Sequence, residues 1–263
     1  MHPVLFKIGS FELASYGLMT ALGYGAAAWY LARHLKRVNM DTDTLWNILF
    51  IAFMGALVGA KLLYIIVSWP QLGATTAEKI SYILHNFRYG FVFFGGLIVS
   101  VSAVIIYLRR KKLPLAKTAD FIITAVPLGH ALGRIGCFLA GCCHGKPTTM
   151  PWGVVFNDPH TLVAPELVGV PVHPTQLYES FGNFILFLLL HKLYQRPHKD
   201  GSIVLAYTVC YSLMRFVIEF FRGDYRGGFI LGLSPSQLLA LTAAVLAGAG
   251  YIYLYRKGKQ HAR

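Results

Sequence analysis

Apolar stretches recur along this chain, each close to the length that a helix needs to cross a lipid bilayer. A bilayer core of about 30 Å takes about 20 residues of α-helix. Hydrophobic residues make up 56% of the 263 residues and charged residues only 13%, about half the charged fraction of a soluble domain. The sequence therefore predicts an all-α integral membrane protein. Seven transmembrane helices are expected, at roughly 14–32, 45–68, 91–108, 119–140, 177–194, 202–221 and 236–255.

Basic residues are concentrated in every second connection between these segments. Clusters of lysine and arginine follow the first, third, fifth and seventh segments, at 33–37, 109–117, 192–199 and 256–263. Because cytoplasmic loops are rich in Lys and Arg, we expect the N-terminus outside and the C-terminus in the cytoplasm. This distribution accounts for the formal net charge of +13 without a nucleic-acid partner.

We expect a single polytopic membrane domain over residues 1–263, with two long outer connections that form a small irregular extracytoplasmic cap. The first connection, about 69–90, contains the amphipathic stretch TAEKISYILHNF. The second, about 141–176, contains PWGVVF, whose weak alternation is typical of a short strand. Its six prolines break the chain too often for a separate domain.

Three of the predicted spans contain a cation far from their cytoplasmic end. At 1.5 Å per residue, Lys61 lies about 24 Å along its helix, and Arg134 and Arg215 each lie about 21 Å along theirs. A charge inside the membrane costs about 2.5–3.5 kcal/mol on the insertion scale. Three cations at one depth indicate a shared anion near the outer surface. A phospholipid phosphate fits, since guanidinium binds phosphate with two hydrogen bonds.

Two further charges lie beside Arg215. Glu219 follows it by four residues and Arg222 follows Glu219 by three, so the three side chains share one helix face. Glu219 can neutralise one cation. Structural roles stay open: Arg215 and Glu219 could form an ion pair, Lys61 could extend its ammonium to the surface, and Arg134 could bind carbonyls of a broken helix.

Small and aromatic residues near these cations are candidates for the lining of a pocket. Gly95 and Gly96 lie near the outer end of the third span, where glycine lets backbone approach a ligand. Glycines in such helices also serve packing alone. Tyr16 could bind the phosphate or headgroup through its hydroxyl, or could anchor the first span at the membrane interface.

Five short motifs lie on these segments in order: YGLM from Tyr16, GGLI from Gly95, GRIG from Gly133, HPTQLYE from His173 and RFVIEFFR from Arg215. Together they resemble the prolipoprotein diacylglyceryl transferase family over most of the chain. The resemblance implies transfer of a diacylglyceryl group from phosphatidylglycerol to the lipobox cysteine thiol of a prolipoprotein signal peptide. A thioether forms and glycerol phosphate leaves.

The resemblance also implies where the protein works and what it binds. We expect a multi-pass protein of the bacterial cell (inner) membrane, with its active site toward the extracytoplasmic leaflet. Its partners are phosphatidylglycerol, prolipoprotein signal peptides and membrane lipids, and the reaction needs no cofactor. Arg134 and Arg215 would stabilise the leaving phosphate.

Three positions depart from the usual motifs of that family. A histidine, a candidate general base, usually precedes the paired glycines, and this chain has Phe94 there. Cys137 stands where the family has asparagine, and Cys142 stands where it has glutamate. We expect His130, four residues before Arg134 on the same helix face, to accept the thiol proton instead. A helix–helix hydrogen bond is the alternative role for this histidine.

The cysteines of CFLAGCCHG leave three interpretations open. Cysteine binds zinc, but paired C-x2-C motifs are absent, so we predict no metal. Cys137 could form a disulfide with Cys142 or Cys143, since the outer side is oxidising. Free thiols packed as small apolar side chains are favoured, with Cys137 lining the phosphate pocket.

Two other functional classes compete with the transferase. A transporter commonly shows polar residues at the midplane and matching repeats, whereas the charges here lie toward one face. A paralogue that binds phospholipid without the reaction is the other alternative, and Phe94 favours it.

Overall fold

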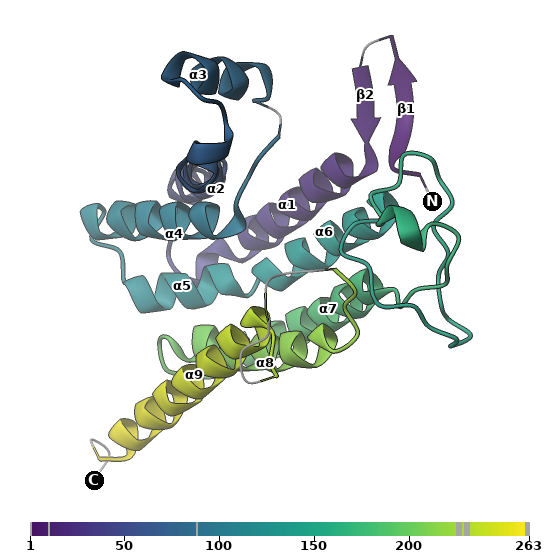
Figure 1. The fold of residues 1–263 in the computed structure, drawn as a ribbon. Helices are drawn as coiled ribbons and strands as arrows, with labels where there is room; N and C mark the ends of the chain where they lie inside the picture. The colour runs from purple at the N-terminus through teal and green to yellow at the C-terminus, as the bar shows by residue number, and fades with distance from the viewer. Residues whose placement is uncertain (1, 10, 88, 225–227, 229–231, 261–263) are drawn as a thin grey trace. The chain divides into compact units, whose positions relative to one another are not determined.

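The computed structural model describes residues 2–9, 11–87, 89–224, 228 and 232–260, and it is mostly helical, as predicted (Figure 1). A two-stranded antiparallel hairpin near the N-terminus was not predicted. The elements are β1 (Val4–Ile8), β2 (Phe11–Ala14), α1 (Ser15–His34), η1 (Leu35–Arg37), α2 (Thr42–Ser68), η2 (Trp69–Gln71), α3 (Thr76–His85), α4 (Phe93–Arg110), α5 (Leu115–Ile123), α6 (Val126–Ala140), η3 (Pro165–Leu167), α7 (Thr175–Tyr194), α8 (Ser202–Glu219) and α9 (Pro235–Gln260).

Each segment predicted to cross the membrane is helical. Within the described residues, five helical stretches are long and apolar enough to do so: Thr42–Gln71, Phe93–Arg110, Leu115–Ala140, Ser202–Glu219 and Pro235–Arg256. Helices α1 and α7 are each 20 residues long but are not among the five, and α7 carries a stripe of buried polar residues. A membrane protein built from helices is supported. Seven spans and an outside N-terminus stay predictions.

The fourth predicted span is broken into two helices. Helix α5 ends at Ile123 and α6 begins at Val126, with Pro127 in its first turn. Proline lacks an N–H, and its ring clashes with the carbonyl four residues back, which here belongs to Ile123. The Thr124 hydroxyl donates to the carbonyl of Phe121 at 2.6 Å in this break. Arg134 therefore lies about two turns into α6, rather than deep in one continuous helix.

The chain divides into two compact units, Met1–Leu31 with Ala119–Arg263, and Ala32–Thr118. In the second unit, α2 packs against α4 through glycines. A Cβ on Gly55 would lie 2.8 Å from the Ser100 Cα, and one on Gly96 would lie 2.7 Å from the Ala56 carbonyl oxygen. A Cβ on Gly59 or on Gly95 would lie even closer to the carbonyl oxygen of the other glycine. Helix packing therefore explains Gly95 and Gly96, whose role in substrate binding stays a prediction.

In the first unit, α7 packs between α6 and α8, and α9 packs on α8 (Figure 1). Helix α1 approaches α6 at two glycines. A Cβ on Gly23 would lie 2.6 Å from the Gly129 carbonyl oxygen, and one on Gly136 would lie 3.2 Å from the backbone of Tyr16. Small residues let helix backbones come this close in membranes, so α1 is held against the helix that carries Arg134.

Of the two connections predicted as a cap, the first forms the expected helix, and the second is irregular but lacks the expected short strand. The amphipathic stretch forms α3, whose first turn is closed by reciprocal hydrogen bonds between Thr75 and Glu78. Residues 141–176 are irregular, with a small core of Phe156, Val163 and Val172. PWGVVF contributes a single bridge, from Val154 to Val172, instead of a strand. The extracytoplasmic position of both connections stays a prediction.

The glycine contacts between α2 and α4 generate a test of stability. Gly96→Ala adds a methyl group against backbone and should lower the free energy of unfolding by about 1–3 kcal/mol. Gly25→Ala is the control, because nothing lies within 4 Å of a Cβ there and alanine favours a helix over glycine by about 1 kcal/mol. Thermal unfolding of each purified variant in detergent measures this. Equal midpoints for the two variants would contradict the packing described.

Candidate active site

A carboxylate on α7 is contacted by basic side chains from neighbouring elements. Glu179 is fully buried. Its Oε1 accepts a hydrogen bond from Arg134 Nη2 at 2.8 Å and lies 3.5 Å from His130 Nε2. Its Oε2 lies 4.0 Å from Arg215 Nη1 and 3.8 Å from Arg222 Nη1. Basic groups from α6, from α8 and from the turn after α8 therefore meet at one side chain.

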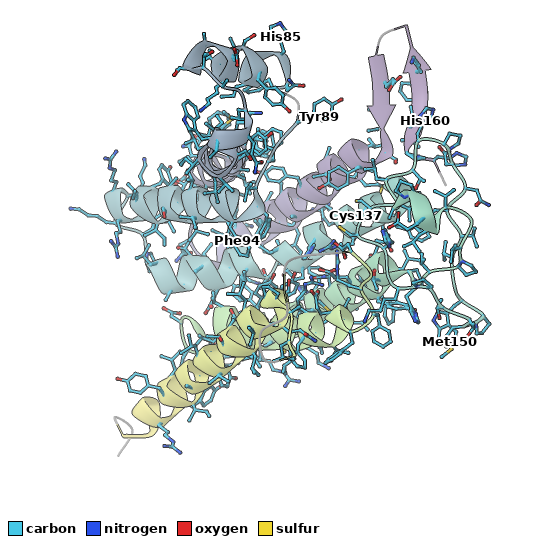
Figure 2. The ribbon with its side chains drawn as sticks, viewed as in Figure 1. His85, Tyr89, Phe94, Cys137, Met150 and His160 are labelled. Atoms are coloured by element: carbon cyan, nitrogen blue, oxygen red, sulfur yellow. The ribbon has the colours of Figure 1, made fainter. Side chains whose placement is uncertain are left out.

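Helical spacing on α6 places its polar side chains on one face. His130, Arg134 and Cys137 follow one another at intervals of four and three residues. Arg134 Nε donates to His130 Nε2 at 3.2 Å, and Arg134 Nη1 lies 4.0 Å from the Cys137 sulfur. The lone pair of His130 Nε2 is thus engaged by Arg134. Cys137 lies in the last turns of α6, where Figure 2 labels it.

A second ion pair forms on α8, which was one of the alternatives left open by the sequence. Arg215 Nη2 lies 2.6 Å from Glu219 Oε2, one turn along the helix. Arg222 Nε lies 3.9 Å from the same oxygen. Ser234 donates its hydroxyl to Glu219 Oε1 at 3.0 Å. Arg222 also forms two hydrogen bonds with the carboxylate of Asp224, at 2.9 and 2.7 Å.

These contacts correct the charge balance inferred from the sequence. Glu219 alone was expected to neutralise one cation and to leave the others for an external anion. The structure adds Glu179 and Asp224 to the cluster. The three arginines therefore meet three carboxylates: Arg134, Arg215 and Arg222 with Glu179, Glu219 and Asp224. Any anion that enters this cluster must exchange with carboxylate contacts that already exist.

Backbone pairing fixes Arg222 beyond the end of α8. Lys146 N donates to the Phe221 carbonyl at 2.8 Å, and Gly223 N donates to the His144 carbonyl at 3.1 Å. Burial lowers the pKa of Arg222, but the hydrogen bonds and charge of Asp224 outweigh it and hold that pKa above its ordinary value. The guanidinium is therefore charged and held in position.

Glu179 was not among the candidate site residues predicted from the sequence. A signal was present. Gln176, Glu179, Ser180 and Asn183 recur at helical spacing on an otherwise apolar helix, and all four are buried. Asn183 Nδ2 donates to the Glu179 carbonyl at 2.8 Å. The hydroxyl of Tyr211, which was not considered, donates to Glu179 Oε1 at 3.4 Å.

Lys61 has partners inside its own unit. Its ammonium donates to the carbonyls of Tyr89 at 2.7 Å, Phe87 at 3.3 Å and Asn86 at 3.5 Å. It also lies 5.2 Å from the centre of the Phe87 ring, an attractive cation–π arrangement. These contacts link Lys61 to the turn after α3 and explain why a lysine can be buried there. A substrate-binding role for Lys61 stays a prediction.

Two aromatic positions singled out in the sequence are exposed. Phe94 lies on α4, where Figure 2 labels it, with 52% of its surface exposed. Tyr16 lies at the start of α1 and is 47% exposed. Its backbone, rather than its ring, makes the close contact with α6 at Gly136. Binding of a headgroup by Tyr16 stays a prediction.

An apolar groove lies between α6 and α7. The α6 residues that line it are different from the polar residues His130, Arg134 and Cys137 of the same helix. The volume of the groove is about 400 Å³, and the Ser180 hydroxyl at its wall donates to the Ala131 carbonyl at 2.8 Å. A groove of this composition suits a hydrocarbon chain. It is lined by Leu128, Ala131, Leu132, Ile135, Leu177, Ser180, Phe181 and Phe184.

Comparison with known proteins identifies similar sequences over nearly the whole chain. Residues 3–253 match the family described as prolipoprotein diacylglyceryl transferase. A Clostridium tetani (strain Massachusetts / E88) protein named phosphatidylglycerol–prolipoprotein diacylglyceryl transferase is 36% identical, over 94% of this chain and 95% of that protein. Phosphatidylglycerol–prolipoprotein diacylglyceryl transferase 2 of Clostridium perfringens (strain 13 / Type A) is 33% identical, over 100% and 98%. The Pseudoalteromonas atlantica (strain T6c / ATCC BAA-1087) protein is 31% identical, over 98% and 91%.

The contacts of Glu179 generate a test of the site's integrity. Glu179→Gln keeps the shape of the side chain but removes the anion that Arg134 contacts, so it should lower the free energy of unfolding by about 3 kcal/mol. Glu166→Gln is the control, because Glu166 is exposed on the irregular connection. Thermal unfolding in detergent measures both. A Glu179 variant as stable as the control would show that the carboxylate does not hold the cluster together.

Proposed function

The chain belongs to the prolipoprotein diacylglyceryl transferase family, and we propose that it transfers a diacylglyceryl group from phosphatidylglycerol to the lipobox cysteine of prolipoproteins. The observation that carries this proposal is the convergence of Arg134, Arg215 and Arg222 on Glu179. The names of the relatives supply the reaction, and the arginines supply a site for the phosphate diester of the lipid.

Arg134 and Arg215 bind the lipid phosphate. Their side chains are only 14% and 10% exposed, and both Nη atoms of Arg215 are buried, so the site must open for a ligand to reach them. Guanidinium and phosphate match in a planar, two-bonded geometry. Because the cluster is already balanced, the phosphate takes over contacts from Glu179 and Glu219. The carboxylates orient the arginines before the lipid arrives. Groups that are oriented in advance are better able to stabilise charge in the transition state.

The thiol proton goes to His130. In the structure Arg134 Nε donates to His130 Nε2, so this nitrogen is free to accept a proton once Arg134 turns to the phosphate. Glu179 Oε1, 3.5 Å from the same nitrogen, then stabilises the imidazolium. Lipid binding and the activation of the base are thereby coupled through one arginine.

In the reaction the thiolate attacks the glyceryl carbon that carries the phosphate ester. The new carbon–sulfur bond replaces the carbon–oxygen bond, and glycerol phosphate leaves with the electron pair. Thiolate rather than thiol is the nucleophile, so proton removal and attack must be aligned. The groove between α6 and α7 holds an acyl chain of the lipid beside this centre.

The site lies toward the extracytoplasmic leaflet of the bacterial inner membrane, where the signal peptide presents its cysteine. The charge pattern of the connections supports this placement, because the basic clusters follow alternate spans. The chain then crosses the membrane seven times, with α1 and α7 completing the five apolar spans.

Loss of a phosphate-binding arginine should reduce transfer strongly. We expect Arg134→Ala and Arg215→Ala each to lower kcat/KM by about 10²–10³-fold, the effect of removing one charge-stabilising donor. Release of glycerol phosphate from phosphatidylglycerol, with and without a lipobox peptide, measures this. Arg196→Ala, an exposed arginine after α7, is the control. Release that does not depend on the peptide, or lipid binding without release, would point to a lipid-binding protein instead.

Removal of the imidazole should slow the proton-transfer step. We expect His130→Phe to lower kcat by about 10²–10⁴-fold with little change in KM, as for loss of a general base. His160→Phe, at an exposed position in the connection after α6, should leave kcat unchanged. A lipidation assay with a fluorescent lipobox peptide measures both. Full activity of the His130 variant would assign the proton to another group.

A further inference from the structure

The loop after α6 brings three cysteine thiols together beside the arginine cluster. The sulfur atoms of Cys137, Cys142 and Cys143 all lie within 4.8 Å of one another, and the four cysteines of the chain form no disulfide. Three sulfurs bound to one ion at about 2.3 Å lie about 4 Å apart. The observed spacing therefore needs little movement to place all three sulfurs around one metal ion.

The backbone of this loop is held in the shape that directs the thiols inward. Gly141 ends α6 in the left-handed region, with φ +82°, and Cys143 also has a positive φ, 60°. For a residue other than glycine this conformation costs about 1–2 kcal/mol. Gln176 Nε2 donates to the Cys142 carbonyl at 2.8 Å, and the Thr175 hydroxyl donates to the Cys143 carbonyl at 2.9 Å. Buried side chains of α7 thus hold a strained loop against α6.

Positive charge lies next to these sulfurs. Arg134 Nη1 is 4.0 Å from the Cys137 sulfur, and Arg222 interacts with Cys143. Thiolates, the form in which cysteine binds metals, are favoured beside guanidinium groups. These two arginines, which also contact Glu179 and Asp224, are the basic groups nearest the sulfur ligands that we describe.

We propose that Cys137, Cys142 and Cys143 form a three-sulfur site for a soft, thiophilic metal ion, with monovalent copper as the preferred ion. Structural zinc sites take four ligands, and among the residues that the structure describes, the group of mutually close ligand atoms has only these three members. Soft thiolate ligands select monovalent copper. The complex carries a formal charge of −2 and lies beside Arg134 and Arg222, which also contact Glu179 and Asp224.

Metal binding at this site involves no oxidation. Each of the three thiols gives up a proton to solvent and forms one sulfur–copper bond, so copper stays monovalent. Spacing in the sequence predicted no metal here because it offers no paired C-x2-C motif. The left-handed backbone at Gly141 and Cys143 folds Cys142 and Cys143 back toward Cys137. The three sulfurs therefore come together although their spacing in the sequence is not that of a metal motif.

Anaerobic titration of the reduced, metal-free protein in detergent tests the site. Monovalent copper is added against a chromophoric chelator, and we expect one equivalent to bind per chain, with an ultraviolet charge-transfer band. Cys143→Ser and Cys137→Ser should each lower the affinity at least about 100-fold, because loss of a residue that only supports a ligand already costs about 10–100-fold. Cys210→Ser, which changes the exposed cysteine of α8, should bind copper as the unchanged protein does.

A second measurement needs no variant. Alkylation of the folded protein, followed by mass spectrometry of its peptides, should show copper protecting Cys137, Cys142 and Cys143, while the labelling of Cys210 is the same with and without copper. Reduced protein that takes up no copper, or equal uptake after Cys143→Ser, overturns the proposal. Uptake of Zn²⁺ alone overturns the three-sulfur assignment.

Discussion

Glu179 fixes the positions of three helices relative to one another within their unit. A buried carboxylate or guanidinium without a partner carries a penalty of several kcal/mol, so α6, α7 and α8 must bring their charged groups together. Arg134 reaches the carboxylate from α6, and Arg215 and Arg222 approach it from α8 and the turn beyond. Packing of apolar surface alone would let these helices slide or rotate, because lipid is as apolar as their side chains.

The balance of charges in this cluster bears on how the enzyme handles its substrate. Among the described residues of this cluster, each of the three arginines contacts a carboxylate. The phosphate diester that we propose as ligand would therefore enter by exchange, and the carboxylates it displaces would become available for other contacts. Glu179 lies 3.5 Å from His130, so it is close enough to interact with this imidazole when its contacts with the arginines are exchanged. Because Glu179 contacts both Arg134 and His130, the same side chains could serve lipid binding and proton transfer in the proposed reaction.

Much of the helical content was predictable, because apolar runs of membrane length leave few alternatives. The pairing of Arg215 with Glu219 followed from helical spacing. The break before α6 had a visible cause in Pro127, but the hydropathy of the segment concealed it. The polar stripe that contains Glu179 was visible in the sequence, but its partners were not, since they depend on which helices become neighbours. The thiol cluster depended on the backbone of Cys143, which local residue types do not specify.

The glycine contacts between α2 and α4 determine how that pair of helices can move. Where side chains separate two helices, rotamer changes let the helices shift by small steps. Here backbone meets backbone at Gly55 and Gly96, and likewise at Gly59 and Gly95, so no rotamer can absorb a displacement. The two helices must therefore travel as a rigid body. Any rearrangement of this unit during a reaction cycle has to hinge in its connecting segments.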